Sequence, residues 1–338
     1  MKKKVLALAL AAVMALSLAA CGSSGSSSPA PAASTGGSSA SSAAPAAEEY
    51  TVGICQLAPH PALDAATQGF KDALTEEFGD AISFKEGNAG GEAANCPTIV
   101  DGFIAEGVDL ILANATSPLQ AAAAATSTIP VLGTSVTDYA TALGIDNWTG
   151  TVGNNISGTS DLAPLDQQAQ MLHELFPDAA NVGLLYCSGE ANSIYQVTVI
   201  QAALEEMGYT CTQYAFTDVN DLPSVTQVAC DNSDVIYVPT DNTAANNTET
   251  IANVVLAAGV PVIAGEEGIC SGCGVATLSI SYYDIGYISG QMAVKILKGE
   301  ADVSTMPVEF APNVTKMYNA ANCELLNVTV PEDYEAIG

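Results

Sequence analysis

The chain has 338 residues, of which 49% are hydrophobic and 13% are charged, so about 290 residues beyond the N-terminal region are enough for two ordinary domains. It carries 37 acidic residues against eight basic ones, a formal net charge of −29 at pH 7. This balance excludes charge-driven binding to nucleic acid or to anionic lipid, because both would be repelled. The regular apolar runs also exclude a disordered acidic chain.

The first 21 residues have the order of parts of a secretory signal. Three lysines follow the initial methionine, an apolar run covers residues 5–16, and the segment ends in Leu-Ala-Ala-Cys21. At ~12 residues the run is shorter than the ~20 that a membrane-spanning helix needs. Leu-Ala-Ala-Cys looks like the bacterial lipoprotein cleavage box, which predicts that Cys21 is the lipidated first residue of the mature protein. An ordinary signal peptide with Cys21 as a free thiol is the alternative.

Residues 22–48 consist almost wholly of Ser, Gly, Ala, Thr and Pro. A segment of this composition does not bury a core, and it predicts a flexible tether between the anchor and a folded body.

Strands and helices are predicted to alternate through the rest of the chain. In the first half, strands are expected at 50–55, 81–86, 108–112 and 130–133, with helices at 62–78, 96–106 and 118–125. After a bridge at 151–161, strands are expected at 181–186, 209–215, 235–238 and 261–264, with helices at 164–175, 193–207, 222–229 and 244–258. A further helix is predicted at 282–299. The same alternation occurring twice predicts an α/β protein with two similar lobes, each built on a parallel sheet.

Five segments at the ends of predicted strands are rich in small polar residues. They are 57–64, 115–118, 188–193, 239–243 and 264–268. In doubly wound sheets, ligands bind outside the carboxyl ends of the strands. The first N–H groups of the helices that follow lack partners within the helix and favour a carboxylate. Helix capping explains any one segment by itself, but five segments from both halves favour a binding site.

These segments resemble those of one known family. The sequences at 60–64 (His-Pro-Ala-Leu-Asp), 115–116, 160–162, 188–193 (Ser-Gly-Glu-Ala-Asn-Ser), 238–243 (Val-Pro-Thr-Asp-Asn-Thr) and 264–268 are similar, in order and spacing, to those of ABC-transporter substrate-binding lipoproteins of the tryptophan/tyrosine-binding type. The resemblance covers residues 50–310. It implies a type I periplasmic-binding fold with two Rossmann-like lobes, a hinge of three crossovers and a cleft between the lobes.

The resemblance also implies how the chain is divided between the lobes. Lobe 1 is expected to hold residues 49–158 and 282–308, and lobe 2 residues 159–281 and 309–338. The implied partners are a small-molecule ligand, an ABC permease and its ATPase, with the protein outside the cytoplasm and anchored by lipid. No cofactor is implied.

An α-amino acid between the lobes would need carboxylates for its ammonium group, and Asp241 and Glu190 are the predicted candidates. Each of them is equally well explained as a solvated turn residue or a helix cap. The ligand's carboxylate is predicted to bind at Thr116 and Ser117, aided by Asn192 or Ser193. His60 and Leu63 are predicted to line the side-chain pocket, with Tyr282 and Tyr283 as further candidates near a hinge. The remaining predicted contacts are Ser160, Asp161, Thr240, Asn242 and Glu266.

An enzyme, a sensor, and a sugar- or nucleoside-binding protein are the alternative functional classes. The chain has two histidines and none of the nucleophile-elbow, Walker, dinucleotide-binding or zinc-protease motifs, so it is not expected to be an enzyme or to hold a metal. A sensor that presents its ligand to a membrane receptor, or the same fold binding a sugar or nucleoside, is the alternative function.

Eight cysteines follow Cys21. Cys270-Ser-Gly-Cys273 is the one pair close enough in sequence for a local disulfide, and the alternative is that all eight remain thiols.

Overall fold

The computed structural model describes residues 49–337. The predicted signal, the lipidation site Cys21 and the whole Ser/Gly/Ala/Thr/Pro-rich segment at 22–48 lie outside the described residues. Within 49–337, no helix is both long enough and apolar enough to cross a membrane.

The described chain contains two sheets, one in each predicted lobe. The first sheet has the strand order β11-β5-β4-β3-β1-β2, and all its neighbours are parallel. Its strands are β1 (Tyr50–Gln56), β2 (Ile82–Asn88), β3 (Leu110–Asn114), β4 (Val131–Val136), β5 (Ile156–Ser160) and β11 (Glu309–Phe310).

The second sheet has the order β13-β12-β10-β9-β8-β6-β7, and only the β10–β12 pair is antiparallel. Its strands are β6 (Asn181–Cys187), β7 (Thr210–Phe216), β8 (Val235–Val238), β9 (Val262–Ala264), β10 (Ala276–Ile280), β12 (Val314–Tyr318) and β13 (Glu335–Ala336). Sequential strands joined by helices give parallel pairing, as the alternation in the sequence predicts.

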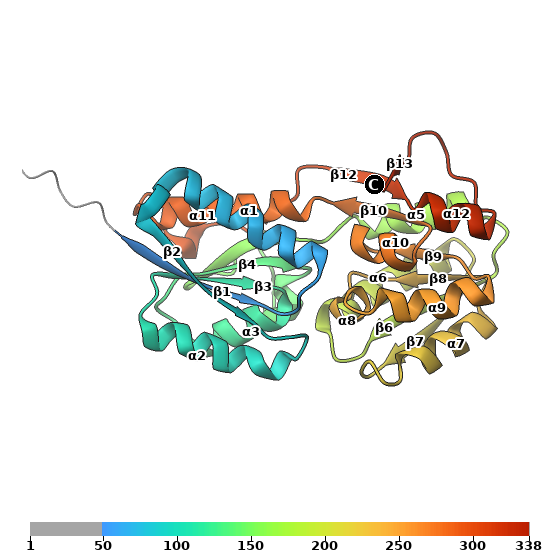
Figure 1. Ribbon diagram of the computed structural model, residues 1–338, viewed down its shortest axis with the longest axis horizontal. Helices are drawn as coiled ribbons and strands as arrows, with labels where there is room; N and C mark the ends of the chain where they lie inside the picture. Colours follow the sequence, from blue (N-terminus) through green and yellow to red (C-terminus); the bar gives the residue numbers. More distant parts are fainter. Residues whose placement is uncertain (1–48, 338) are drawn as a thin grey trace, which may run out of the picture. The chain divides into compact units, whose positions relative to one another are not determined.

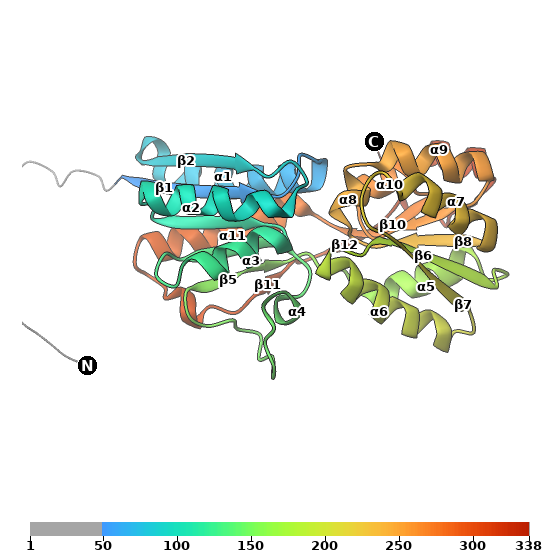
Figure 2. The same cartoon turned by 90° about the horizontal axis from the view of Figure 1, so that it is seen from below.

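Helices cover both faces of each sheet. In lobe 1, α1 and α11 lie side by side on one face, and α2 and α3 lie on the other (Figure 1). In lobe 2, α5 and α6 cover one face, and α7, α8, α9 and α10 cover the other (Figure 2). The helices are α1 (Pro61–Phe78), α2 (Cys96–Glu106), α3 (Thr116–Ala125), α4 (Tyr139–Leu143), α5 (Leu165–Leu175), α6 (Ala191–Glu206), α7 (Leu222–Asn232), α8 (Asn242–Ala245), α9 (Thr248–Ala258), α10 (Glu267–Cys273), α11 (Tyr282–Leu297) and α12 (Ala320–Leu326).

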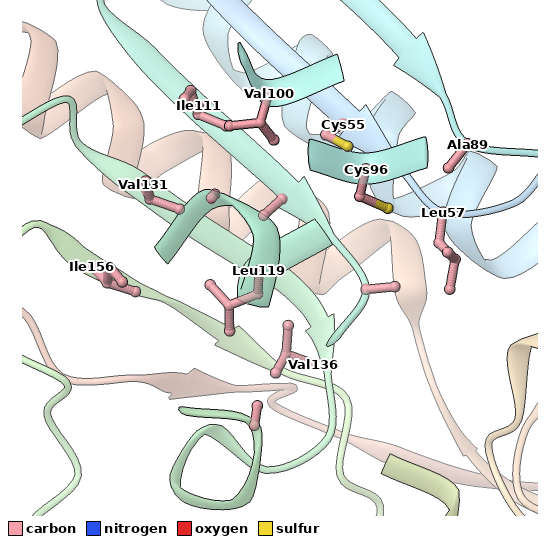
Figure 3. Packing of buried hydrophobic residues seen from close by; sticks show 14 of the residues in the cluster. Cys55, Leu57, Ala89, Cys96, Val100, Ile111, Leu119, Val131, Val136 and Ile156 are labelled. Carbon is pink, nitrogen blue, oxygen red and sulfur yellow. The ribbon is translucent and has the colours of Figure 1, made fainter. Parts of the chain in front are cut away.

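Each sheet has a separate apolar core on each of its faces, because central parallel strands are buried on both sides. The β3 strand, Leu-Ile-Leu-Ala-Asn, is buried at every position. Alternate residues reach opposite cores: Ile111 packs toward α2 and α3, whereas Leu110 and Leu112 pack toward α1 and α11. Figure 3 shows the first of these cores, in which Val100 of α2 and Leu119 of α3 lie over the sheet.

The chain passes between the lobes three times: after β5, after β10 and after β11. The first sheet therefore includes residues up to Ser160, two residues beyond the predicted lobe boundary at 158. It also includes Glu309 and Phe310, which the predicted division placed in lobe 2. The hinge thus lies at the carboxyl ends of β5 and β10 and at the short β11–β12 connection.

Several elements differ from the sequence prediction. The predicted bridge at 151–161 contains β5, whose Ile-Ser-Gly-Thr-Ser sequence lacks an apolar run yet is wholly buried. The predicted helix at 244–258 is two helices, α8 and α9, separated at Asn246–Asn247. Six elements near the C-terminus were not predicted: α10, β10, β11, β12, α12 and β13. Each has at most seven residues, so periodicity gives little signal there.

The helices α1 and α11 touch backbone to backbone through glycines. A Cβ atom on Gly286 would lie 2.0 Å from the Ala66 carbonyl oxygen, and one on Gly69 would lie 2.2 Å from the Tyr283 carbonyl oxygen. Such distances are far inside van der Waals contact, so only glycine fits at these two crossings. The N-termini of both helices are thereby held together at the lobe boundary.

The eight cysteines of the described chain are free thiols. The local disulfide considered for Cys270 and Cys273 is not formed. Both residues lie in α10 and are buried, and the Cys273 thiol donates a hydrogen bond to the Ile269 carbonyl at 3.3 Å. The short Cys-Ser-Gly-Cys spacing reflects one helical turn.

Candidate functional site

The carboxyl ends of strands from both lobes meet around one pocket. It is lined by His60 and Leu63 at the start of α1, by Asp161 and Tyr282 at two of the crossovers, and by residues of lobe 2, namely Thr240, Asp241, Asn242, Ala245 and Glu266. Parallel strands place all these ends on the same edge of their sheets, which is why residues ~200 positions apart in sequence are neighbours here.

Asp161 has an unsatisfied carboxylate in this pocket. Its side chain is buried, and Oδ2 accepts a hydrogen bond from the Tyr282 hydroxyl at 3.0 Å. Oδ1 is also buried and has no hydrogen-bond partner within residues 49–337. Burial raises the pKa of Asp161 to about 6, although the nearby hydroxyls of Thr137 and Tyr282 act in the opposite direction. An unpaired buried carboxylate is costly, so its position in a pocket indicates a role in binding a cation.

Two other carboxylates, those of Asp241 and Glu190, are occupied by donors of the protein itself. Asp241 accepts hydrogen bonds from the backbone N–H groups of Cys187 at 2.7 Å and Ala244 at 2.8 Å, and from the Ser193 hydroxyl at 2.7 Å. Burial, followed by repulsion from Glu190, raises the pKa of Asp241 to about 8.

Glu190 is the N-cap residue of α6, and its carboxylate reaches across to the start of α8. It accepts from the backbone N–H groups of Asn242 at 3.0 Å and Thr243 at 2.8 Å, and from both of their side chains at 2.7 Å. The Asn192 amide donates to it as well, at 3.0 Å. Both residues predicted to hold a ligand's ammonium group thus already have several donors within lobe 2, although Asp241 also lines the pocket.

Replacing Asp241 by alanine is expected to destabilise the fold by about 3 kcal/mol, since three buried donors would lose their acceptor. The midpoint of urea unfolding measures this change, and Asp101→Ala, at an exposed position in α2, is the matched control, expected to stay within ~0.5 kcal/mol. An unfolding midpoint equal to that of the wild type, with a ligand affinity reduced tenfold, would instead return Asp241 to direct ligand contact.

Glu266 is the third buried carboxylate of the pocket. It is the N-cap residue of α10 and accepts from the backbone N–H groups of Gly268 at 2.6 Å and Ile269 at 2.5 Å. Burial raises its pKa to about 7, and Asp161 adds a smaller repulsion. Glu266 thus has a structural role but also contributes negative charge to the pocket.

The start of α3 offers a site of opposite polarity at the same edge of the first sheet. Within the described chain α3 has no side-chain cap, and its N-cap residue, Ala115, has the strained torsion φ 110°. The backbone N–H groups of Thr116 and Ser117 are therefore available for an anion. On the neighbouring strand end, Ser135 (φ 54°) has a buried hydroxyl with no partner in the described residues.

Side-chain hydrogen bonds connect the lobes around the pocket. His60 Nε2 lies 3.3 Å from Asn242 Oδ1, and the Gln196 amide of α6 donates to the Thr137 hydroxyl of lobe 1 at 3.4 Å. Burial lowers the pKa of His60, which favours the neutral ring in this contact. The lobes are therefore in contact around the pocket.

The structure brings most of the predicted site residues together. Eight of them, including Tyr282, line the pocket, and three lie directly behind it: Glu190, Asn192 and Ser193. Tyr283, the other candidate near the hinge, does not line the pocket, and its hydroxyl donates to Asp72 instead. Ser160 donates to the Thr137 carbonyl at the first crossover, and Thr116 and Ser117 begin α3 without lining the pocket.

The sequence prediction missed Ala245, Thr137, Ser135 and Gln196, and it named Tyr282 without its contact to Asp161. The positive φ at Ser135 cannot be predicted from the sequence. Thr137 could have been included, because it is a polar residue directly after a buried strand.

The pocket is anionic. None of the lysines in the described chain lines it. Four of them form ion pairs elsewhere, Lys71 with Glu86, Lys85 with Glu106, Lys298 with Glu77, and Lys316 with Glu174 and Asp333. No lysine of the described residues therefore supplies a positive charge to Asp161.

Comparisons with known proteins support the two-lobed fold. The tyrosine-binding protein of Clostridioides difficile (strain R20291) is 32% identical over 264 residues, which cover 77% of this chain and 76% of that protein. The crystal structure of an ABC domain from Streptococcus pneumoniae in complex with L-Trp superposes with a TM-score of 0.82 at 29% identity, covering 86% of this chain and all of that one.

A second structural comparison concerns the arrangement of the lobes. The ligand-free, open structure of a substrate-binding protein with adhesive properties from Clostridium difficile is 33% identical and covers 85% of this chain and 99% of that one, but its TM-score is 0.66. The chain therefore matches the L-Trp complex more closely than the open form, in spite of the lower identity.

These relatives have the type I periplasmic-binding fold, with two lobes of mainly parallel sheet, as the resemblance in the sequence implied. The family model for ABC transporter substrate binding proteins matches residues 51–336. The chain belongs to the family of ABC transporter substrate-binding proteins.

Proposed function

We propose that this protein captures an aromatic L-amino acid between its lobes and delivers it to an ABC permease and its ATPase, outside the cytoplasm and anchored through a lipid on Cys21. The unpartnered Oδ1 of Asp161, buried in an interlobe pocket that no described lysine lines, is the observation that carries the proposal. The tyrosine-binding and L-Trp-binding relatives support the aromatic class. The Leu-Ala-Ala-Cys21 sequence supports the anchor.

In this proposal the ligand's ammonium group binds Asp161 Oδ1. The ammonium supplies the charge that the carboxylate lacks, and Tyr282 holds the other oxygen at 3.0 Å. A charge-assisted hydrogen bond in a buried site is stronger than a neutral one and is lost to any ligand without the amino group.

The ligand's carboxylate binds at the start of α3, to the N–H groups of Thr116 and Ser117, with the Ser135 hydroxyl as an added donor. A helix N-terminus is suited to this task in a chain that has no arginine, because partial charges of the backbone replace a cationic side chain. In this proposal Asp161 holds the ammonium group and the start of α3 holds the carboxylate of the same α-amino acid.

The ligand's side chain lies against His60 and Leu63 of lobe 1 and against Asn242 and Ala245 of lobe 2. Since residues of both lobes line the pocket, a ligand that fills it stabilises the closed form, and this closed form is what the permease recognises. The function is binding and delivery, with no chemical step.

Titration calorimetry with the twenty amino acids, and with sugars and nucleosides, tests the proposal. We expect tryptophan, tyrosine or phenylalanine to bind most tightly. A matched pair of analogues then tests the two polar contacts of the ligand separately: 3-(4-hydroxyphenyl)propanoate lacks the ammonium group of tyrosine, and tyramine lacks the carboxylate.

The des-amino analogue is expected to bind at least ~100-fold more weakly than tyrosine, because it leaves Asp161 unpaired. Binding of a sugar or nucleoside without binding of any amino acid would contradict the proposal, and so would equal affinity for tyrosine and its des-amino analogue.

A further inference from the structure

Tyr282 and Asp161 connect two of the crossovers between the lobes. Asp161 follows β5, and Tyr282 is the first residue of α11, directly after the crossover from β10. Both side chains are buried, and their hydrogen bond of 3.0 Å joins segments 121 positions apart in sequence. This hydrogen bond uses Oδ2 of Asp161, and Oδ1 of Asp161 has no hydrogen-bond partner in the described residues.

The Tyr282 hydroxyl is a permanent donor. Burial, followed by the negative charges of Asp161 and Glu266, raises the pKa of Tyr282 well above its ordinary value of 10. The phenol therefore keeps its proton at neutral and acidic pH. A permanent donor favours the charged form of the carboxylate that accepts from it.

Other groups that face Asp161 act against its charge or are neutral. Glu266, from the start of α10, repels it, and the buried phenol of Tyr139 in α4 interacts with it. Asp241 and His60 line the same pocket, and burial lowers the pKa of His60, which favours its neutral form. Thr137 is the one further hydroxyl that favours the charged form.

Resting on the proposed function, we infer that Tyr282 is a positioning residue: its hydroxyl keeps the Asp161 carboxylate charged and fixes its orientation, so that Oδ1 meets the ligand's ammonium group. Ligand affinity is then present when Asp161 is ionised and falls as acid protonates it. Removing the hydroxyl makes this loss begin at a higher pH.

Tyr282→Phe tests the inference, and Tyr283→Phe is its matched control. The phenylalanine ring retains the packing of Tyr282 against Ala62, Ala66 and Ile285. Tyr283 is the next residue, and its hydroxyl also donates to a carboxylate at 3.0 Å, that of Asp72, but it is 39% exposed.

The dissociation constants of L-tyrosine and L-tryptophan are measured by calorimetry from pH 5 to pH 8. For Tyr282→Phe we expect the midpoint of the affinity loss to rise by about one pH unit, the equivalent of one hydrogen bond to a charged group. Binding would then be about tenfold weaker than in the wild type at pH 5 and within about threefold at pH 8, while Tyr283→Phe follows the wild type. A curve for Tyr282→Phe that is parallel to that of the wild type at all pH values would overturn the inference.

A second measurement needs no ligand. In protein with ¹³C-labelled aspartate carboxyls, the Asp161 signal is identified by its absence from Asp161→Asn, and its titration midpoint is compared between wild type and Tyr282→Phe. A midpoint raised by about one unit supports the inference, and an unchanged midpoint overturns it even if aromatic amino acids bind. A raised midpoint in a protein that binds no amino acid would reject the proposed function and leave only the electrostatic part of the role of Tyr282.

Discussion

Asp161→Asn is expected to weaken binding of the aromatic amino acid at least ~100-fold and, at the same time, to leave the ligand-free protein as stable as the wild type or more stable. Breaking a buried ion pair by removing one partner costs about 3–5 kcal/mol of binding free energy. In the ligand-free state the same carboxylate is unpaired at Oδ1, and the amide has no charge to desolvate. Binding and stability therefore change in opposite directions, which distinguishes a ligand contact from a structural residue.

The stability gain has a defined pH dependence. The pKa of Asp161 is about 6 in the folded protein against an ordinary value of 3.8, so the folded state holds this proton more tightly than the unfolded state. The cost of the charge is absent below about pH 4, grows as the pH rises, and reaches about 3 kcal/mol near pH 7. Thermal unfolding of both proteins at pH 4 and pH 7 measures it: the variant should match the wild type at pH 4 and unfold a few degrees higher at pH 7.

An Asp161→Asn protein that binds tyrosine or tryptophan as the wild type does would remove Asp161 from the site. A variant that loses binding and stability together would show that Asp161 supports the fold.

The fold was largely predictable from the sequence, but the role of each carboxylate was not. Runs such as Leu110–Asn114 are apolar, short and bounded by helices, so their place in a parallel sheet follows from pattern alone. The polar residues at the ends of those strands predicted the position of the pocket, because the carboxyl ends of parallel strands lie at the same edge of a sheet. Asp161, Asp241 and Glu190 are alike in sequence, however, and which of them is left unsatisfied depends on the N–H groups that the tertiary structure brings to Asp241 and Glu190.

Gly286→Ala is expected to destabilise the protein by about 3 kcal/mol or more, although alanine is the better helix former by about 1 kcal/mol. The new methyl group would lie 2.0 Å from the Ala66 carbonyl oxygen and 2.7 Å from its Cα, which are backbone atoms of α1. The two helices would have to separate, and the cores beneath them would lose contacts. The midpoint of urea unfolding measures the loss.

Gly102→Ala provides a control of opposite sign. Gly102 lies in the interior of α2 on its exposed side, and an added Cβ would meet no atom of the described residues within 4 Å. Alanine there should stabilise the protein by about 0.5–1 kcal/mol through helix propensity alone. If both substitutions stabilised the protein equally, the contact between α1 and α11 would be looser than the backbone distances indicate.

The close contact of α1 and α11 also restricts how ligand preference can change. His60 and Leu63 lie at the start of α1, and Tyr282 lies at the start of α11. Because the two helices are in backbone contact, the residues on this wall of the pocket keep their positions relative to one another. Asn242 and Ala245 belong to the short helix α8 of lobe 2, which is free of such glycine crossings in the described chain. A combinatorial library intended to redirect the protein to a new amino acid, for instance as a fluorescent biosensor, should therefore vary positions 242 and 245 and leave the opposite wall intact.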